Sequence, residues 1–532
     1  MSLRAKKHGH ALCNRNNTCM LLLIAIIALG LAISLLIYAG PNAVYDDSTY
    51  MGIAHMYSNG VIEFNNVFSY GFLFTGMITL SGMAFGYTDF SAIFVSIAGF
   101  VFLVLFTFMA GKELGGERLG IIAGFFVSTA PIIDANVTRV VPDIATGAVV
   151  AASLYFLIKG LKSKKPLMFF YSGVVGALSV YVKMEGLIFL MGMFLAVMTF
   201  AIFSKSIKRK KQKRKMRNRI DVRYPAYMLV GIVLLLLLYL VPFYTITGNP
   251  IYALQNYGRA QVQARGGYQM LLLPFEAANP IMFYNLGWTY YYMYPFGLFV
   301  LFFMLGCLLL IKHRDSKARY IAAIALLCFL FMFYGSTSLS HYRSFGTLPR
   351  FFDDIIAPMA LTAAVFVEWM ALKISGGKNR TASLFIVALF IFVLLDQAGV
   401  YGFLGSNNSE ISGANAFYMN LTRYAASIAI AKPVSLYVMN AERDGQPESH
   451  GVIMYLNYTL TPYKNVSVYG RSESCAANQG TEKLLLLENG AGYGYSNMSN
   501  MDTWLAAGGC SVTLMEQYAP EGYVEARLYK IS

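Results

Sequence analysis

The strongest constraint on this chain is its succession of long apolar segments with few charges, joined by short basic connectors. Apolar residues make up 57% of the 532 residues and charged residues only 13%, a composition that is far too apolar for a soluble globular protein. A run of about 20 apolar residues is long enough to cross a bilayer as a helix. The chain is therefore predicted to be a polytopic α-helical protein of the cell membrane.

About eleven transmembrane helices are expected. They run approximately over residues 20–38, 90–110, 118–133, 143–160, 167–183, 186–203, 226–246, 286–311, 319–336, 353–373 and 382–398. Charges occur only at the ends of these segments. Coupled transporters usually need ionisable groups near the middle of the membrane, and the chain shows no two matching halves, so transport is disfavoured.

Residues 41–88 are predicted to form a re-entrant or interfacial pair of outer juxtamembrane helices, because their apolar run, 70–86, is short and interrupted by glycine. This choice places every basic connector in the cytoplasm, whereas counting 70–86 as a span would place them all outside. The basic residues before residue 20 then put the N-terminus in the cytoplasm. A cleaved signal peptide is the alternative for 20–38, but the run is long for one.

The charge of the chain divides near residue 404. Residues 405–532 contain 8 Lys and Arg against 11 Asp and Glu, so the excess of basic residues lies in 1–404. We expect 405–532 to be a small extracytoplasmic domain, α/β or β-rich, with strands near 434–439, 483–487 and 523–531. If this tail is external, Cys475 and Cys510 could pair as a disulfide, which the sequence alone leaves open.

The most basic stretch, residues 205–219, has ten Lys and Arg. It is interpreted as a cytoplasmic anchor that attracts anionic membrane lipids. No aromatic residues alternate with the charges, as stacking on bases would need, so no nucleic-acid partner is expected.

Polar residues gather instead on the predicted outer side, beginning with Asp46 and Asp47 directly after the first span. The residues predicted to bind substrate are Asp47, Tyr50, Arg139, Asp143, Lys183, Glu185, His341, Arg343 and Arg350. Carboxylates beside cations at a membrane surface suit a lipid-linked phosphate substrate together with an acceptor that needs a base. Simpler roles remain open: Asp46, Asp47 and Asp143 could cap helices, and the others could be ordinary interfacial or loop residues.

Four motifs in order resemble a known family. Asp46-Asp47-Ser48-Thr49-Tyr50 resembles the first outer loop of polyprenyl-phosphate-sugar-dependent glycosyltransferases of the GT-C superfamily, related to protein O-mannosyltransferases and aminoarabinose transferases. Thr138–Asp143, Gly176–Gly186 and Arg350–Pro358 are similar to three further family segments. The resemblance covers about residues 40–360 and implies that 1–404 is a GT-C-like transmembrane catalytic domain.

The resemblance also implies roles for single residues. Asp46 would be the catalytic carboxylate, and Asp47 stands where the family usually has Glu. Lys183 and Arg350 would contact the lipid phosphate, with assistance from Arg343, and Asp143 would line the same cavity. Some relatives bind a divalent metal through a His in the outer loop after the seventh span. Residues 247–285 contain no His and His341 is a poor substitute, so the metal stays open.

The expected function is transfer of a sugar, a hexose such as mannose, from a polyprenyl-phosphate carrier to an acceptor on the outer face. The acceptor would be a protein, a lipid or a glycan. Two alternatives stay open: a flippase or transporter of lipid-linked sugar, and a non-catalytic membrane protein with a binding ectodomain.

Overall fold

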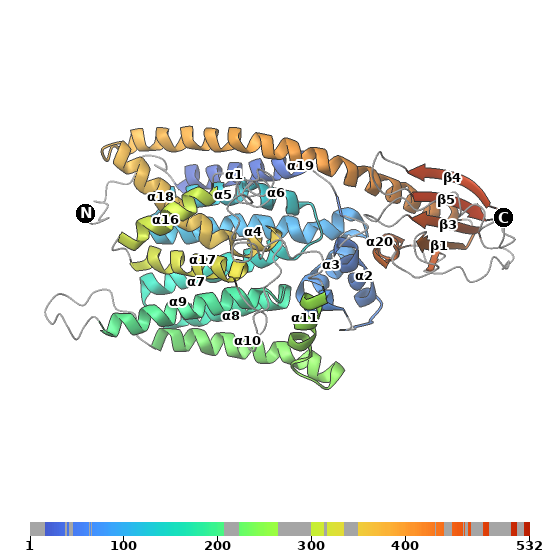
Figure 1. The fold of residues 1–532 in the computed structure, drawn as a ribbon, viewed down its shortest axis with the longest axis horizontal. Helices are drawn as coiled ribbons and strands as arrows, with labels where there is room; N and C mark the ends of the chain where they lie inside the picture. Colours follow the sequence, from blue (N-terminus) through green and yellow to red (C-terminus); the bar gives the residue numbers. More distant parts are fainter. Residues whose placement is uncertain are drawn as a thin grey trace, which may run out of the picture.

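Figure 1 shows an elongated molecule in which a helical bundle is followed by a small β-sheet. This computed structural model describes residues 16–37, 40–41, 46–62, 64, 66–206, 223–263, 299–312, 316–334, 349–430, 432–440, 450–460, 462, 466–469, 482–488, 512–518 and 526–531. The long helix α19 (Asn379–Ala429) leads from the bundle to the sheet.

The bundle is built from helices that are apolar on most of their surface. Besides α19, they are α1 (Asn16–Leu36), α4 (Asp89–Gly115), α5 (Glu117–Ser128), α6 (Pro131–Val137), α7 (Asp143–Ser163), α8 (Pro166–Val182), α9 (Gly186–Ser206), α10 (Arg223–Thr247), α16 (Phe299–Lys312), α17 (Ser316–Tyr334) and α18 (Ile356–Ile374). Buried aliphatic and aromatic side chains fill its core. Leu237 and Leu395 remain 59% and 69% exposed, as expected where a helix faces lipid.

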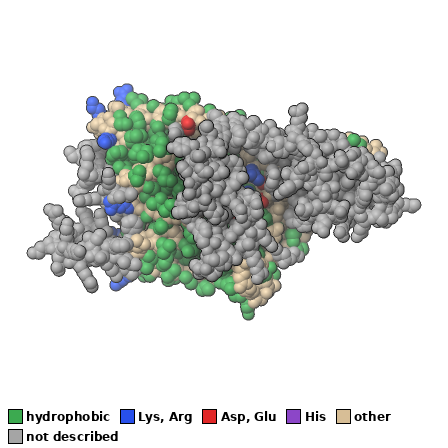
Figure 2. Space-filling model, viewed as in Figure 1, with side chains coloured by type: hydrophobic (Ala, Val, Ile, Leu, Met, Phe, Trp, Pro, Cys, Tyr) green, Lys and Arg blue, Asp and Glu red, His purple; other side chains and the backbone are tan. Residues whose placement is uncertain are grey.

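The structure agrees with a multi-pass membrane protein. Six described helices are long and apolar enough to cross a bilayer, and the bent pair α5–α6 would make a seventh. Every one of the predicted spans overlaps a helix, but several of these helices are short, so the count of eleven stays a prediction. In Figure 2 a band of hydrophobic side chains lies beside an end of the bundle where Lys and Arg gather.

The segment between the first two long helices forms the expected pair of helices. They are α2 (Asp46–Ser58) and α3 (Phe72–Phe85), joined through the short 3-10 helix η1 (Val67–Tyr70). The 14 residues of α3 extend only about 21 Å, less than the roughly 30 Å of a bilayer core. Figure 1 shows α2 and α3 at the end of the bundle that faces the sheet, and α11 (Tyr252–Gln263) lies at the same end.

The sheet has five strands in the order β2-β1-β3-β5-β4. They are β1 (Val434–Asn440), β2 (Val466–Tyr469), β3 (Glu482–Glu488), β4 (Val512–Tyr518) and β5 (Ala526–Ile531). Strand β1 pairs in parallel with β2 and β3, and β5 pairs antiparallel with β3 and β4. Helix α20 (His450–Leu460) connects β1 to the parallel strand β2, as parallel pairing requires. This region is therefore α/β.

The sequence located three of the strands and missed two. The runs at 434–439, 483–487 and 523–531 overlap β1, β3 and β5. Strand β2 has only four residues, too few for a clear alternation pattern. The boundary expected at residue 404 falls inside α19. The composition of the chain changes there, but the helix continues through the change. Cys475 and Cys510 lie outside the described residues.

A second hydrophobic core joins the sheet to the bundle. It contains Met51 of α2, Phe74 of α3, Tyr418 of α19 and Leu456 of α20, and it continues to Leu436 of β1. The hydroxyls of two buried α20 tyrosines also bond to α4: Tyr455 donates to Asp89, and Tyr458 lies 3.0 Å from the Ser91 hydroxyl oxygen. Helix α20 therefore contacts both the start of α4 and helix α2.

Helices α8 and α10 pack closely through two glycines. A Cβ added at Gly173 would lie 2.1 Å from the Met228 carbonyl oxygen, and one at Gly231 would lie 2.5 Å from that of Phe170. Small residues permit such backbone contact between membrane helices. The pair therefore fixes the distance between α8 and α10.

We expect Gly173→Ala to lower the thermal unfolding midpoint of the purified protein, since overpacking of this kind costs about 1–3 kcal/mol. Gly76→Ala on α3 is the matched control, because nothing lies within 4 Å of a Cβ built there. Equal midpoints for the two variants would show that the α8–α10 contact is not tight.

Candidate active site

The first acidic position of the chain lies in contact with the late cationic motif. The guanidinium of Arg350 donates to the Asp46 carboxylate, although 304 positions separate the two residues. Arg350 lies on the 3-10 helix η5 (Pro349–Ile355), directly before α18, and Asp46 opens α2. Their side chains keep 19% and 29% of their surface exposed, so a ligand can reach both groups.

Asp143 connects this pair to a second, buried cation. Its carboxylate accepts from the Lys183 ammonium at 2.7 Å and lies 4.0 Å from the Arg350 guanidinium nitrogen Nε. Lys183 also donates to Asp354 at 3.1 Å. Lys183 and Asp143 are only 7% and 1% exposed. The five side chains form one ionic network with its accessible end at Asp46 and Arg350.

Lys183 stays charged in this network. Burial alone would lower its pKa, but the carboxylates of Asp143, Asp354 and Glu185 outweigh that effect and hold the pKa above its ordinary value. The ammonium also lies 4.0 Å from the centre of the Phe351 ring, a favourable cation–π position.

Local backbone geometry explains why these residues meet. Lys183 occupies the tight turn between α8 and α9, and its N–H donates to the Ser179 carbonyl. Helix η5 lies directly on α7, since a Cβ at Gly147 would be 2.6 Å from the Asp353 carbonyl oxygen. In a 3-10 helix, residues three apart lie above one another. Phe351 and Asp354 can therefore both contact Lys183.

Asp47 has a different environment from its neighbour. Its side chain is fully buried and accepts from the Arg139 guanidinium at 2.6 Å and from the Val140 backbone N–H at 2.7 Å. Asp47 thus attaches the start of α2 to the segment before α7. Of the two adjacent acids, Asp46 alone belongs to the network, and Arg139 belongs with Asp47.

Tyr50 lies one helical turn after Asp46 and shares its face of α2. Its ring packs edge-on against Phe68 and Phe74. Burial raises the pKa of Tyr50, and the charges of Asp46, Asp143 and Glu185 raise it further, so the phenol stays neutral. Glu185 is buried near Lys183, but its side chain makes no hydrogen bond or ion pair with another described residue.

Sequence reasoning missed the pair Asp353 and Asp354. Both are buried, and Asn136 donates to Asp353 at 2.8 Å while Asp354 accepts from Lys183. Two adjacent acids before an apolar segment repeat the pattern of Asp46 and Asp47, and this signal could have identified them. The predicted site residues His341 and Arg343 lie outside the described residues.

Carboxylates outnumber cations in the described network, because Asp46, Asp143 and Asp354 contact Lys183 and Arg350, and Glu185 is also buried nearby. Even so, within the described ranges no group of three or more His, Cys, Asp and Glu side chains is arranged to hold a metal ion. We therefore assign no metal ligands.

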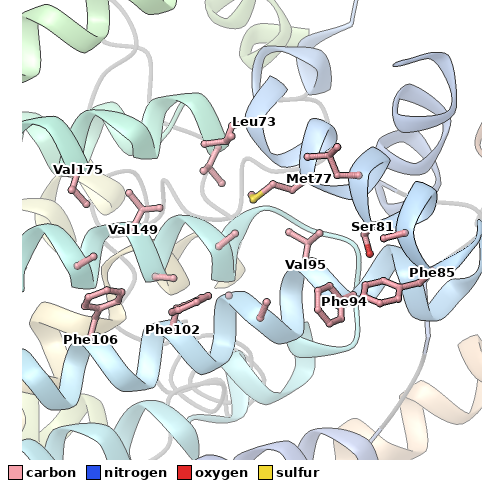
Figure 3. Close-up of a pocket in the computed structure, with 18 residues that line it drawn as sticks. Leu73, Met77, Ser81, Phe85, Phe94, Val95, Phe102, Phe106, Val149 and Val175 are labelled. Carbon is pink, nitrogen blue, oxygen red and sulfur yellow. The ribbon is translucent and has the colours of Figure 1, made fainter. Parts of the chain in front are cut away.

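An apolar groove of about 580 Å³ lies between α3, α4, α7 and α8. Figure 3 shows Phe94, Phe102 and Phe106 of α4 along the groove, with Met77 of α3 and Val149 of α7 among the other lining residues. Two further lining residues lie near the network in the chain: Ala145 is two residues after Asp143, and Val182 directly precedes Lys183. The groove therefore starts beside the ionic network.

Three comparisons with known proteins bear on this arrangement. The model of a family described as dolichyl-phosphate-mannose-protein mannosyltransferase matches residues 71–244. Two crystal structures of ArnT from Cupriavidus metallidurans share the fold. The one bound to undecaprenyl phosphate is 13% identical, with a TM-score of 0.51 over 97% of this chain and 98% of ArnT. The apo structure is 12% identical, with a TM-score of 0.54 over 96% and 98%. No curated protein matches the sequence.

The protein is a multi-pass membrane protein with the fold of ArnT. Its bundle of apolar helices has an ionic site at one end and is joined to a small α/β region. The family match over residues 71–244 and the fold shared with ArnT both agree with a glycosyltransferase of the GT-C superfamily. The resemblance drawn from the four motifs is confirmed at this level.

The contacts of Asp47 generate a prediction about stability. Asp47→Ala leaves the Val140 N–H and Arg139 without their acceptor, and we expect a loss of about 1–3 kcal/mol in unfolding free energy. Asp47→Asn keeps an acceptor for the N–H and should lose less. Thermal unfolding of the purified variants measures both. An Asp47→Ala midpoint equal to that of the unsubstituted protein would contradict the anchoring role.

Proposed function

We propose that this protein transfers a sugar from a polyprenyl-phosphate donor to an acceptor at the outer face of the membrane. The observation that carries the proposal is the accessible contact between the Asp46 carboxylate and the Arg350 guanidinium. A base and a phosphate-binding cation are the two groups that this transfer needs side by side. The family match favours a hexose, mannose first.

Asp46 would act as the general base. It accepts the proton of the acceptor hydroxyl while the hydroxyl oxygen attacks the anomeric carbon of the donor sugar. The bond between that carbon and the phosphate oxygen breaks, and polyprenyl phosphate leaves with the bonding electron pair. Tyr50, which stays a neutral phenol beside Asp46, would supply a hydrogen-bond donor at the same place.

Arg350 would bind the donor phosphate. Its side chain is partly exposed, and its buried Nε has no hydrogen-bond partner among the described residues. In the free protein it is paired with Asp46, so a phosphate that takes over the guanidinium releases the carboxylate to act as base. Lys183 contacts two carboxylates and is almost fully buried. Its role would be to hold Asp143 near Arg350 more than to contact phosphate itself.

The apolar groove would receive the isoprenoid chain of the donor. Its lining residues are apolar apart from Ser81, and it begins beside Asp143 and Lys183. A chain in the groove would keep the phosphate at the ionic network. ArnT in one of the matched structures is bound to undecaprenyl phosphate, a ligand of this kind.

This function sets the expected topology. Residues 1–404 would form the catalytic membrane domain, with the N-terminus in the cytoplasm, and 405–532 would form the extracytoplasmic domain. The sheet lies at the same end of the bundle as α2, which carries Asp46, and this arrangement supports one common side for both.

The two alternative functions are separated from this one by one assay. Membranes are incubated with labelled polyprenyl-phosphate sugar. Release of polyprenyl phosphate supports the enzyme, whereas movement of the intact donor across the membrane supports a flippase. A non-catalytic protein would do neither, and its phenotype would depend on residues 405–532 alone.

We expect Asp46→Asn to express and insert normally but to reduce transfer by about 10²- to 10⁴-fold, the usual contribution of a positioned base. The measurement is release of polyprenyl phosphate by purified protein, with donor binding as the control, since a base contributes to reaction more than to binding. A fully active Asp46→Asn variant would refute the assignment.

Arg350→Gln should raise the KM for the donor by about 10- to 100-fold, because a charged hydrogen bond to phosphate is lost. Arg350→Lys should restore part of the affinity, since lysine keeps the charge without the two-pronged geometry. The matched control is Arg380→Gln, since Arg380 lies at the start of α19, away from the ionic network. Unchanged donor KM in Arg350→Gln would rule out phosphate binding by this residue.

A further inference from the structure

A second hollow of about 310 Å³, lined by apolar surface with a few polar side chains, lies at the same end of the bundle as α2 and α3. It is an open hollow bordered by the start of α4, by α19 and by α20, and none of its lining residues belongs to the ionic network of Asp46. Helix α20 also packs on α2. The hollow therefore lies where the membrane bundle meets the sheet domain.

Two opposite charges line this hollow without forming an ion pair. The Asp89 carboxylate, which is half-buried, accepts a hydrogen bond from the Tyr455 hydroxyl at 3.1 Å. Arg423 on α19 is exposed and lines the same hollow as Asp89. Among described residues, however, Arg423 makes no ion pair or hydrogen bond. The hollow is thus lined by the Asp89 carboxylate, which Tyr455 holds in place, and by the Arg423 guanidinium.

Hydroxyl and aromatic groups complete the lining. Thr422 and Thr459 lie 3.4 Å apart, and each donates to a carbonyl of its own helix, which leaves their oxygens available as acceptors. The Tyr87 ring is fixed by an edge-on contact with Tyr458 at 5.3 Å. The hollow therefore combines acceptors, donors and ring surfaces.

We propose that this hollow binds a sugar residue carried by the acceptor, an inference that rests on the proposed transferase function. Hydroxyl groups of a sugar both donate and accept, so one can donate to Asp89 while its neighbour accepts from Arg423. The C–H faces of a sugar ring pack against aromatic rings. A phosphate is disfavoured, because the Asp89 carboxylate would repel it. The volume is at the lower end of the roughly 300–1,000 Å³ of ligand pockets, which suits one ring more than a long oligosaccharide.

The test measures sugar binding by saturation-transfer NMR on the full chain in nanodiscs of phosphatidylglycerol, which has no sugar headgroup. The probes are the methyl glycosides of mannose, glucose and N-acetylglucosamine. We expect at least one probe to bind, and Asp89→Asn and Arg423→Gln each to weaken that binding by about tenfold or more. Arg380→Gln is the matched control and should bind as the unsubstituted protein does.

Two competition arms identify the source of the sugar. Displacement of the probe by a glycosyl diacylglycerol in the nanodisc indicates a lipid-linked glycan, and failure to displace it indicates a free or protein-linked one. Displacement by phosphatidylethanolamine without any effect of glycolipid would overturn the sugar assignment. So would a lack of binding by every probe, or binding that both variants retain.

This inference and the proposed function fail separately. Asp46→Asn should keep sugar binding in the hollow while losing transfer. If Asp46→Asn transfers normally but the two hollow variants lose binding, the hollow stands and the base assignment falls. If transfer depends on Asp46 and no probe binds, the base assignment stands and the proposed sugar site falls.

Discussion

The site depends on one ionic network that joins four segments far apart in the sequence. Asp46, Asp143, Lys183 and the η5 pair Arg350 and Asp354 come from separate turns at one end of the bundle. Burying charges is costly unless each finds a partner, so such a network fixes relative positions more than it adds stability. Its members lose exposure from Asp46 and Arg350 inward to Asp143. The chemistry is therefore expected at the exposed end, with the buried end as its support.

Adjacent residues in this protein carry different tasks because α2 begins between two other segments. Asp46 turns toward η5 and the network, whereas Asp47 turns toward Arg139 and Val140 and fixes the helix. The hydrophobic core shared by α2, α3, α19, α20 and the sheet holds the same helix from its other side. The position of the proposed base thus depends on both parts of the chain, although the two have very different compositions.

The sequence predicted the class of fold and part of the site, for identifiable reasons. Long apolar runs indicate membrane helices directly, and the motif order brought together Asp46, Asp143, Lys183 and Arg350, which the structure places in contact. What the sequence could not give is which acid pairs with which cation, since that depends on turns distant in the chain. The pairing of Arg139 with Asp47 and the contact of Asp354 with Lys183 were therefore beyond the sequence. The full length of α19 could not be predicted, because the hydropathy changes inside the helix.

The proposed function requires a donor phosphate to take the place of Asp46 on Arg350. A structure of the full chain in nanodiscs with polyprenyl phosphate bound tests it most directly. We expect phosphate oxygens within hydrogen-bond distance of the Arg350 guanidinium, the Asp46 carboxylate released from it, and the isoprenoid chain in the groove between α3, α4, α7 and α8. A phosphate bound elsewhere, with the contact between Asp46 and Arg350 intact, would contradict it.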